Sequence, residues 1–133
     1  MSFPDNTAEI LIYLGYDPSD FMVAADGGGT VIREWAHADP MPTEQDINDA
    51  ALGAAKHFAK EMIRSEAQSL ILKKWPWWKQ SNAQLGLYPA AVVEACQDDI
   101  AAVIQASNAA EDAIDAAATI EAVEAVSASW PVI

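Results

Sequence analysis

Residues 93–117 read VEACQDDIAAVIQASNAAEDAIDAA, and this stretch decides which fold the chain can adopt. Its apolar and small side chains recur at alternating spacings of three and four, at Val93, Cys96, Ile100, Val103, Ser107, Ala110, Ile114 and Ala117. A strict heptad over more than three repeats indicates a long helix with a coiled-coil-like face. We expect this helix over about residues 89–128, and a shift of the apolar pattern at Ile120, Val123 and Val126 either changes the supercoil or marks a break between helices.

The heptad face has two candidate partners. It can pack within one chain on a second helix, expected at residues 44–74, or between chains in an oligomeric coiled coil. A helix of roughly 40 residues would be about 60 Å long, and a partner of about 31 residues, about 46 Å, would not cover it. We therefore favour self-association, with both pairings formed at once, and assign oligomerisation to Val93, Cys96, Ile100, Val103 and Ile114.

The second helix has clear start and stop signals. Thr43 and Asp46 approximate a capping box, which predicts a helix from about Glu44 to Lys74. Its stripe, at four-three spacing, comprises Ala51, Ala55, Phe58, Met62, Ser65, Ser69 and Leu72. Pro76 should end this helix, a short helical turn should stop near Gly86, and Pro89 suits the first turn of the next helix.

Three tryptophans cluster at the expected helix junction. Buried aromatic side chains at a kink usually hold two helices together, so we assign a junction core to Trp75, Trp77 and Trp78.

The first part of the chain is strand-like. The run at residues 9–14 is rich in strand formers, and two further runs, 21–25 and 30–35, flank Asp26-Gly27-Gly28-Gly29. Two such runs around a glycine turn predict a β-hairpin. The fold class is therefore α+β, with a small β-hairpin or meander region over residues 1–42 and a mainly helical domain over residues 43–133.

The hairpin carries more apolar surface than it can bury alone. An isolated two-stranded hairpin is only marginally stable in water, so it must fold back on the helices or be completed by another molecule. Strand addition by a partner would do the second. We assign partner binding to Phe21, Val23, Val31, Ile32 and Trp35.

The charge is acidic and unevenly placed. The 133 residues hold 20 acidic and 7 basic side chains, a net charge of −13. This balance disfavours binding to nucleic acids and to anionic membranes, and it favours solubility or a basic partner. Six of the seven basic residues lie between positions 56 and 79, whereas residues 80–133 hold eight acidic residues and no basic one. These two regions can attract each other within a chain or between chains.

No set of residues predicts catalysis, a cofactor or a metal site. His37 and His57 lack partners at metal-ligand spacing, and Cys96 is flanked by acids that disfavour a thiolate. Asp98 and Asp99 point about 100° apart on a helix, so they cannot act as a catalytic pair. Glu94 with Asp98, and Glu111 with Asp115, are like charges one turn apart, and we expect them to form a solvated acidic face, the alternative being pairs with basic residues of another chain. The three glycines of the turn lack the lysine of a phosphate loop. We therefore expect a non-enzymatic interaction protein.

The remaining signals concern location. A single cysteine excludes an intrachain disulfide, which fits a reducing compartment. The first seven residues do not resemble a signal peptide, and no apolar run reaches the roughly 18 residues of a membrane span.

Two stretches resemble the tail fibre assembly proteins of tailed bacteriophages. The first is the sequence from Asp26 to Trp35 followed by Pro40-Met41-Pro42-Thr43, which is similar to the family's glycine turn, tryptophan-bearing strand and Pro-x-Pro-Thr helix entry. The second is the segment 76–82, PWWKQSN, followed by Ile100, Ser107-Asn108, Glu111 and Ile114. Together they cover roughly residues 26–115, and their shared order and spacing carry the resemblance. The first 25 residues and the alanine-rich tail after Asp115 have no counterpart.

The resemblance implies a chaperone without cofactor or catalytic residues. Such a protein would act in the host cell cytoplasm, bind the distal part of a trimeric fibre and promote its folding and trimerisation. A trimer of this chain would match the symmetry of the fibre and raise the local concentration of its chains. Two alternatives remain: a permanent virion part, such as a baseplate or fibre-attachment subunit, and an acidic inhibitor of a host nucleic-acid-binding protein.

Overall fold

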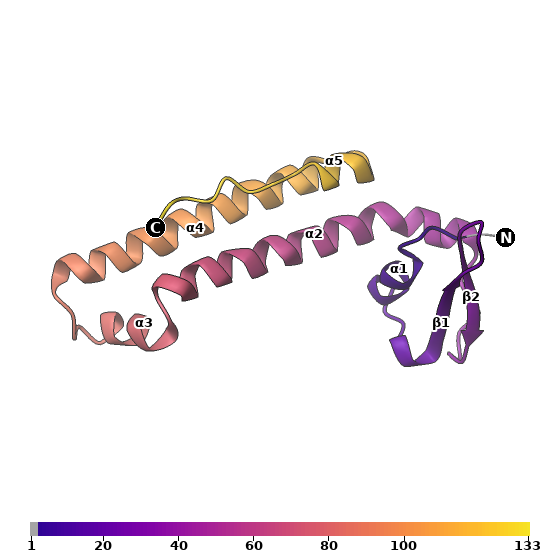
Figure 1. Cartoon of the computed structure of the whole chain (residues 1–133), viewed down its shortest axis with the longest axis horizontal. Coiled ribbons are helices and arrows are strands. Elements are labelled where there is room, and N and C mark those ends of the chain that lie inside the picture. Colours follow the sequence, from indigo (N-terminus) through magenta and orange to yellow (C-terminus); the bar gives the residue numbers. More distant parts are fainter. Residues whose placement is uncertain (1–2) are drawn as a thin grey trace. The chain divides into compact units, whose positions relative to one another are not determined.

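The computed structural model describes residues 3–133 and confirms the α+β class (Figure 1). Its elements, in chain order, are α1 (Thr7–Tyr13), a short 3-10 turn (Pro18–Asp20), β1 (Phe21–Ala25), β2 (Thr30–Trp35), α2 (Glu44–Lys74), α3 (Trp77–Gln84), α4 (Ala90–Ala116) and α5 (Ile120–Glu124). The chain forms two compact units, one reaching to Phe58 and the other running from Ala59 to Ile133. The strand region 1–42 is therefore not a unit by itself, because it folds together with the first half of α2.

The predicted hairpin is confirmed. Strands β1 and β2 pair antiparallel around the turn at residues 26–29. The backbone N–H of Asp26 donates to the carbonyl of Gly29 (3.0 Å), and the Asp26 carboxylate accepts from the N–H of Gly28 (3.1 Å). Gly27 has φ +85° and Gly29 has φ +145°, conformations that a side chain would oppose. The glycines are thus required by the turn.

The expected strand at residues 9–14 is wrong, because most of this run belongs to helix α1. Thr7, Ile10 and Leu11 are all completely buried, and their spacing of three and four is that of one helix face. Adjacent residues of a strand point to opposite faces, so Ile10 and Leu11 could not both enter one core as strand residues. The run was apolar without alternating, which is the weakness of its assignment to a strand.

The core of the first unit lies between α1 and the start of α2. The predicted capping box is confirmed: the Thr43 hydroxyl accepts from the N–H of Asp46 (3.2 Å), and the Asp46 carboxylate accepts from the N–H of Thr43 (2.9 Å). These hydrogen bonds keep the pKa of the Asp46 carboxyl below its ordinary value. Ile47 of α2 is fully buried, like Ile10 of α1.

The stripe predicted for α2 holds only at its start. Ala51 is buried, but Met62 is 64% exposed and Ser65 and Ser69 are exposed. In the second unit, α2 buries Ile63 and Ala67 instead. The sequence allowed two apolar faces here, and the one with four-three spacing is not the one that packs.

The junction between α2 and α3 is stabilised by one tryptophan rather than three. As predicted, α2 ends at Lys74 and Pro76 precedes α3, whose last turn is followed by Gly86 with φ +74°. Trp75 is 7% exposed and packs with Ala83 and Cys96. The assignment of Trp77 and Trp78 to the junction core is wrong, because they are 64% and 61% exposed. Trp75 alone fills the space at this junction, and the first residues of α3 face outward.

Helix α4 ends earlier than predicted and packs within its own chain. It comprises 27 residues, against 31 for α2, so the length argument against an intramolecular pair fails. The two helices run side by side (Figure 1). Cys96, Val103 and Ile114 are buried in the single chain, and Val93 and Ile100 are half-buried. The assignment of the buried three to oligomerisation is therefore wrong, because their side chains are already enclosed.

The shift of the apolar pattern after residue 117 is a break between helices. Ala117 has an extended conformation, and the Thr119 hydroxyl caps α5 by accepting from the N–H of Ala122 (3.1 Å). After α5 the chain turns back along the helices as an extended tail, residues 125–133 (Figure 1). The indole N–H of Trp130 in this tail donates to the Glu66 carboxylate on α2 (3.1 Å).

Candidate interaction surfaces

An aromatic corner, here Tyr16, Phe21, Trp35 and His37, lies at the open end of the hairpin. Phe21 and Trp35 face each other across the strands, and their rings stack with centroids 6.3 Å apart. Tyr16 contacts Trp35 edge-on (4.8 Å) and His37 edge-on (5.0 Å). The Trp35 indole N–H donates to the carbonyl of Asp39 (2.8 Å). The structure thus brings two predicted binding residues together and adds Tyr16 and His37, which the sequence did not single out.

The other three predicted binding residues do not form one surface. Val23 pairs with Ile32, whereas Val31 pairs with Ala24 on the next rung of the ladder. Because neighbours along a strand point to opposite faces, Val31 and Ile32 cannot contact the same partner face. All five predicted residues are half-buried. A partner would meet either face of the sheet, but not these five side chains together.

The hairpin also presents strand edges. The sheet has two strands, so each has one outer edge. Among residues 3–133, the backbone pairing found on the outer edge of β2 joins Phe3 and Thr30, with N–O distances of 2.6 and 3.2 Å. This bridge lies at the turn end of β2 and leaves the Trp35 end for another strand. An unpaired edge is the structural requirement for strand addition.

In the second unit, charges join α2 to α4. Three basic residues of α2 face three acidic residues of α4, in the pairs Lys60–Asp115 (2.9 Å), Arg64–Glu111 (2.8 Å from Nε) and Lys74–Asp99 (2.7 Å). The attraction expected between the basic middle and the acidic last third therefore operates within one chain. Such partly exposed pairs contribute little each, but together they favour this antiparallel alignment.

Asp99 is the best-connected residue of this set. Its carboxylate accepts from Lys74 and from the indole N–H of the buried Trp75 (2.9 Å). These two hydrogen bonds lower the pKa of Asp99, and Lys74 lowers it further by its charge. Asp99 is thus part of the junction, whereas Glu111 and Asp115, which were expected in a solvated acidic face, form ion pairs with α2. Nearby, burial and the charge of Asp99 raise the pKa of the Cys96 thiol, so Cys96 packs as a neutral side chain, as expected.

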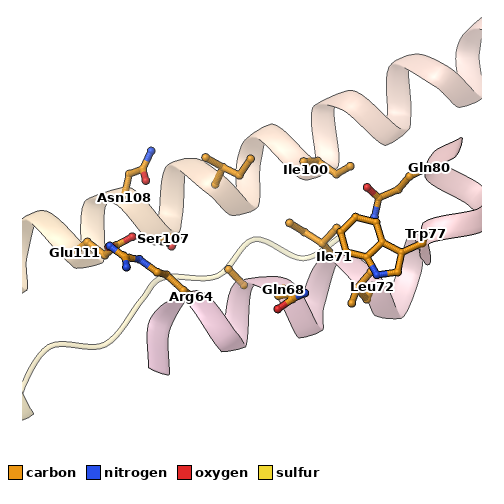
Figure 2. A pocket seen from close by; sticks show the side chains of 12 residues that line it. Arg64, Gln68, Ile71, Leu72, Trp77, Gln80, Ile100, Ser107, Asn108 and Glu111 are labelled. Carbon is orange, nitrogen blue, oxygen red and sulfur yellow. Dashed lines mark hydrogen bonds and ion pairs between the residues drawn. The ribbon is translucent and has the colours of Figure 1, made fainter. Parts of the chain in front are cut away.

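An open groove, the α2–α4 groove, lies between these helices and has a volume of about 420 Å³ (Figure 2). Its wall includes the apolar side chains of Ile71, Leu72, Trp77, Ile100 and Ile104. The ion pair of Arg64 with Glu111 closes one end, and Trp77 and Gln80 stand at the other (Figure 2). This volume is within the range of about 300–1,000 Å³ that is typical of ligand sites.

Exposed apolar side chains continue from the groove over α3. Trp78 and Leu85 are seven residues apart, hence on one face of this short helix, and both are exposed, as is Leu87 after it. Large exposed patches of this kind mark interaction sites in soluble proteins. The sequence did not predict these exposed side chains, because clustered tryptophans at a helix junction favour burial. Ile104 was missed because it stands beside the heptad rather than in it.

Neither a metal site nor a membrane span is found in the part of the chain that the structure describes. Among residues 3–133, no three or more His, Cys, Asp or Glu side chains are grouped so that they could hold a metal ion. None of the described helices is long and apolar enough to cross a membrane.

Comparison with known proteins finds no relative: no family model, no curated protein and no solved structure matches the chain.

Proposed function

We propose that this protein is an assembly chaperone for a bacteriophage tail fibre, which binds the distal part of the fibre and promotes its folding and trimerisation. The observation that carries the proposal is the exposed apolar surface of the second unit: Trp77 and Trp78 are more than half exposed, and Trp77 lines an open groove. Two exposed tryptophans in one short helix need a physical reason, because burying an aromatic side chain is among the largest gains available to a fold.

The client best suited to these surfaces is a polypeptide that has not finished folding. Fibre chains pair as intertwined trimers, and their strand edges and apolar side chains are open to aggregation until they do. The hairpin offers a complementary strand edge next to the aromatic corner. The groove and α3 offer apolar surface for side chains. In the mature fibre these client groups are buried, so the chaperone loses its binding sites and is released.

A trimer of this chain stays a prediction. Val103 and Ile114 cannot form its interface, because they are fully buried within one chain. A trimer would therefore have to use surface that is exposed in the single chain, and light scattering of the purified protein with and without its client would detect it.

The same surfaces would also suit a permanent virion part, since a lasting contact requires exposed apolar groups as well. Mass spectrometry of purified particles separates the two roles: a virion part is present in fixed stoichiometry, whereas a chaperone is absent or scarce. The third alternative, an inhibitor of a host nucleic-acid-binding protein, is favoured only by the exposed acids Glu94, Asp98 and Asp112 of α4.

The direct test is co-expression with a bacteriophage tail fibre protein from the same genome, followed by affinity purification of the tagged chain. We expect the fibre to be recovered with the wild-type protein and to become soluble and trimeric in its presence. A double variant, Trp77→Ser with Trp78→Ser, should recover much less fibre. The matched control is Met62→Ser on α2, which removes an equally exposed apolar side chain away from α3. Equal recovery by both variants, or no fibre with any of them, would contradict the proposal.

A further inference from the structure

The C-terminal tail shows what kind of segment the helices of the second unit accept. Along it, Val126, Ala128 and Trp130 are half-buried, while the intervening Ser127 and Ser129 are exposed. This two-residue alternation is that of an extended chain lying on a surface with one row of side chains inward. The indole N–H of Trp130 donates to the Glu66 carboxylate of α2, and Trp130 lines a hollow together with Ser65, Ser69, Leu70 and Lys73 of the same helix. An uncharged, extended segment therefore already occupies one side of this helix.

The α2–α4 groove lies on the other side of α2. Its wall uses Arg64, Gln68 and Ile71 of α2, whereas the hollow beside Trp130 is lined by Glu66, Leu70 and Lys73. At about 100° per residue, these two sets lie on roughly opposite sides of the helix. The helix thus has two open hollows on roughly opposite sides: one, of about 460 Å³, is bordered by Trp130 of the tail, and the other is the α2–α4 groove.

The open groove suits an uncharged segment. Its two charged lining residues, Arg64 and Glu111, form an ion pair with each other, which raises the pKa of the Arg64 guanidinium. The remaining lining is apolar or carries amides and a hydroxyl. The side chains of Gln68 and Asn108 make no hydrogen bond within the described residues, and amides of this kind both donate to and accept from a peptide backbone. A charged ligand would be left unpaired there, at a cost.

We infer that the α2–α4 groove binds an extended, uncharged segment of a client chain with apolar side chains at alternate positions, in the manner in which the protein's own tail lies on the opposite side of α2. This inference rests on the proposed function and specifies the kind of client segment, since alternate apolar residues are the pattern of a strand with one face to be buried.

The probe is a labelled synthetic peptide with the sequence of the tail, AVSASWPVI (residues 125–133), added to the full-length protein and followed by fluorescence polarisation. Two variants introduce the same charge on the two sides of the helices: Ile104→Glu in the groove and Ser69→Glu on the tail side. Both positions are exposed, so neither change should prevent folding. We expect Ile104→Glu to weaken binding about tenfold or more, because it places an unpaired charge against an apolar ligand, and Ser69→Glu to change it less than about twofold.

A second peptide of the same composition, with valine and tryptophan moved to adjacent positions, tests the alternation and should bind at least about tenfold more weakly. Equal binding of both peptides would overturn the extended geometry. If only Ser69→Glu loses binding, the peptide exchanges with the protein's own tail instead of binding in the groove. If the full chain self-associates and Ile104→Glu abolishes this, the groove binds a second copy of the chain. Either result overturns the inference. Recovery of the fibre by a protein that binds neither peptide would overturn it too, and leave the proposed function standing.

Discussion

Replacing Asp99 tests whether α2 and α4 are joined within one chain. In Asp99→Ala, the indole N–H of Trp75, a residue that is only 7% exposed, loses its acceptor. A buried donor without a partner costs about 1–3 kcal/mol. Loss of the half-exposed pair with Lys74 adds about 0–1 kcal/mol. Alanine is the better helix former and returns about 0.6 kcal/mol. We therefore expect the free energy of unfolding to fall by about 2 kcal/mol.

The matched variant is Asp99→Asn, whose side-chain oxygen can still accept from Trp75 while the charge opposite Lys74 is lost. It should cost no more than about 1 kcal/mol, because only the ion pair is removed. Urea unfolding followed by tryptophan fluorescence measures both variants, and the slope with denaturant should stay that of the wild type. Equal losses in the two variants, or a loss below about 0.5 kcal/mol in Asp99→Ala, would refute the role given to the Trp75 hydrogen bond.

The pH dependence of this pair has a definite sign. The folded state holds the pKa of Asp99 below its unfolded value of about 3.9, so Asp99 contributes stability above that pH. This contribution is lost as the pH falls through the folded pKa. The difference in stability between the wild type and Asp99→Asn should therefore be constant from about pH 5 to 8 and shrink below about pH 4.

Three further outcomes follow from single positions. Ile114→Ala should cost about 2–4 kcal/mol in urea unfolding, because Ile114 is fully buried, while Ile104→Ala at an exposed position should cost less than about 1 kcal/mol. Gly53→Ala should leave stability unchanged or raise it by up to about 1 kcal/mol: the new Cβ would lie 2.8 Å from the hydroxyl of Tyr13, an exposed side chain that can move aside, and alanine favours the helix. Cys96 should react with a thiol reagent at neutral pH on the order of tenfold or more slowly than in urea, because burial shields the thiol and raises its pKa; equal rates would contradict its place in the junction.

The sequence predicted the elements that depend on local chemistry. The bounds of α2 followed from the Thr43–Asp46 capping box and from Pro76, and the hairpin followed from the Asp26–Gly29 turn. The shift in the apolar pattern at Ile120 left two possibilities, a changed supercoil or a break between helices, and the structure has the break. In each case a few neighbouring residues determine the backbone, so no knowledge of distant contacts is needed.

The parts that were missed depend on which surfaces meet. Helix α2 has apolar residues on two faces, and only the packing of α4 selects Ile63 over Met62 for the core. The exposure of Trp77 likewise depends on the space that Trp75 already fills. For the tail, a usable signal did exist: apolar and small residues alternate with serine from Val126 to Trp130, which is the pattern of an extended segment lying on a surface.

The negative charge of this protein opposes the self-association that its exposed apolar surface would otherwise promote. Val103 and Ile104 are neighbours on α4, yet the first is fully buried against the core and the second is 47% exposed in the groove wall. An apolar wall open to solvent promotes self-association, and so do the exposed tryptophans of α3. A net charge of −13 opposes that association, because copies of the chain repel each other before their apolar surfaces meet. The outward acids of α4 therefore oppose self-association through an apolar surface that is open to solvent. Replacing Asp98 and Asp112 by asparagine should increase self-association at low salt without lowering the free energy of unfolding. If the mass measured by light scattering stays unchanged, the negative charge of α4 does not keep the apolar surface from self-association.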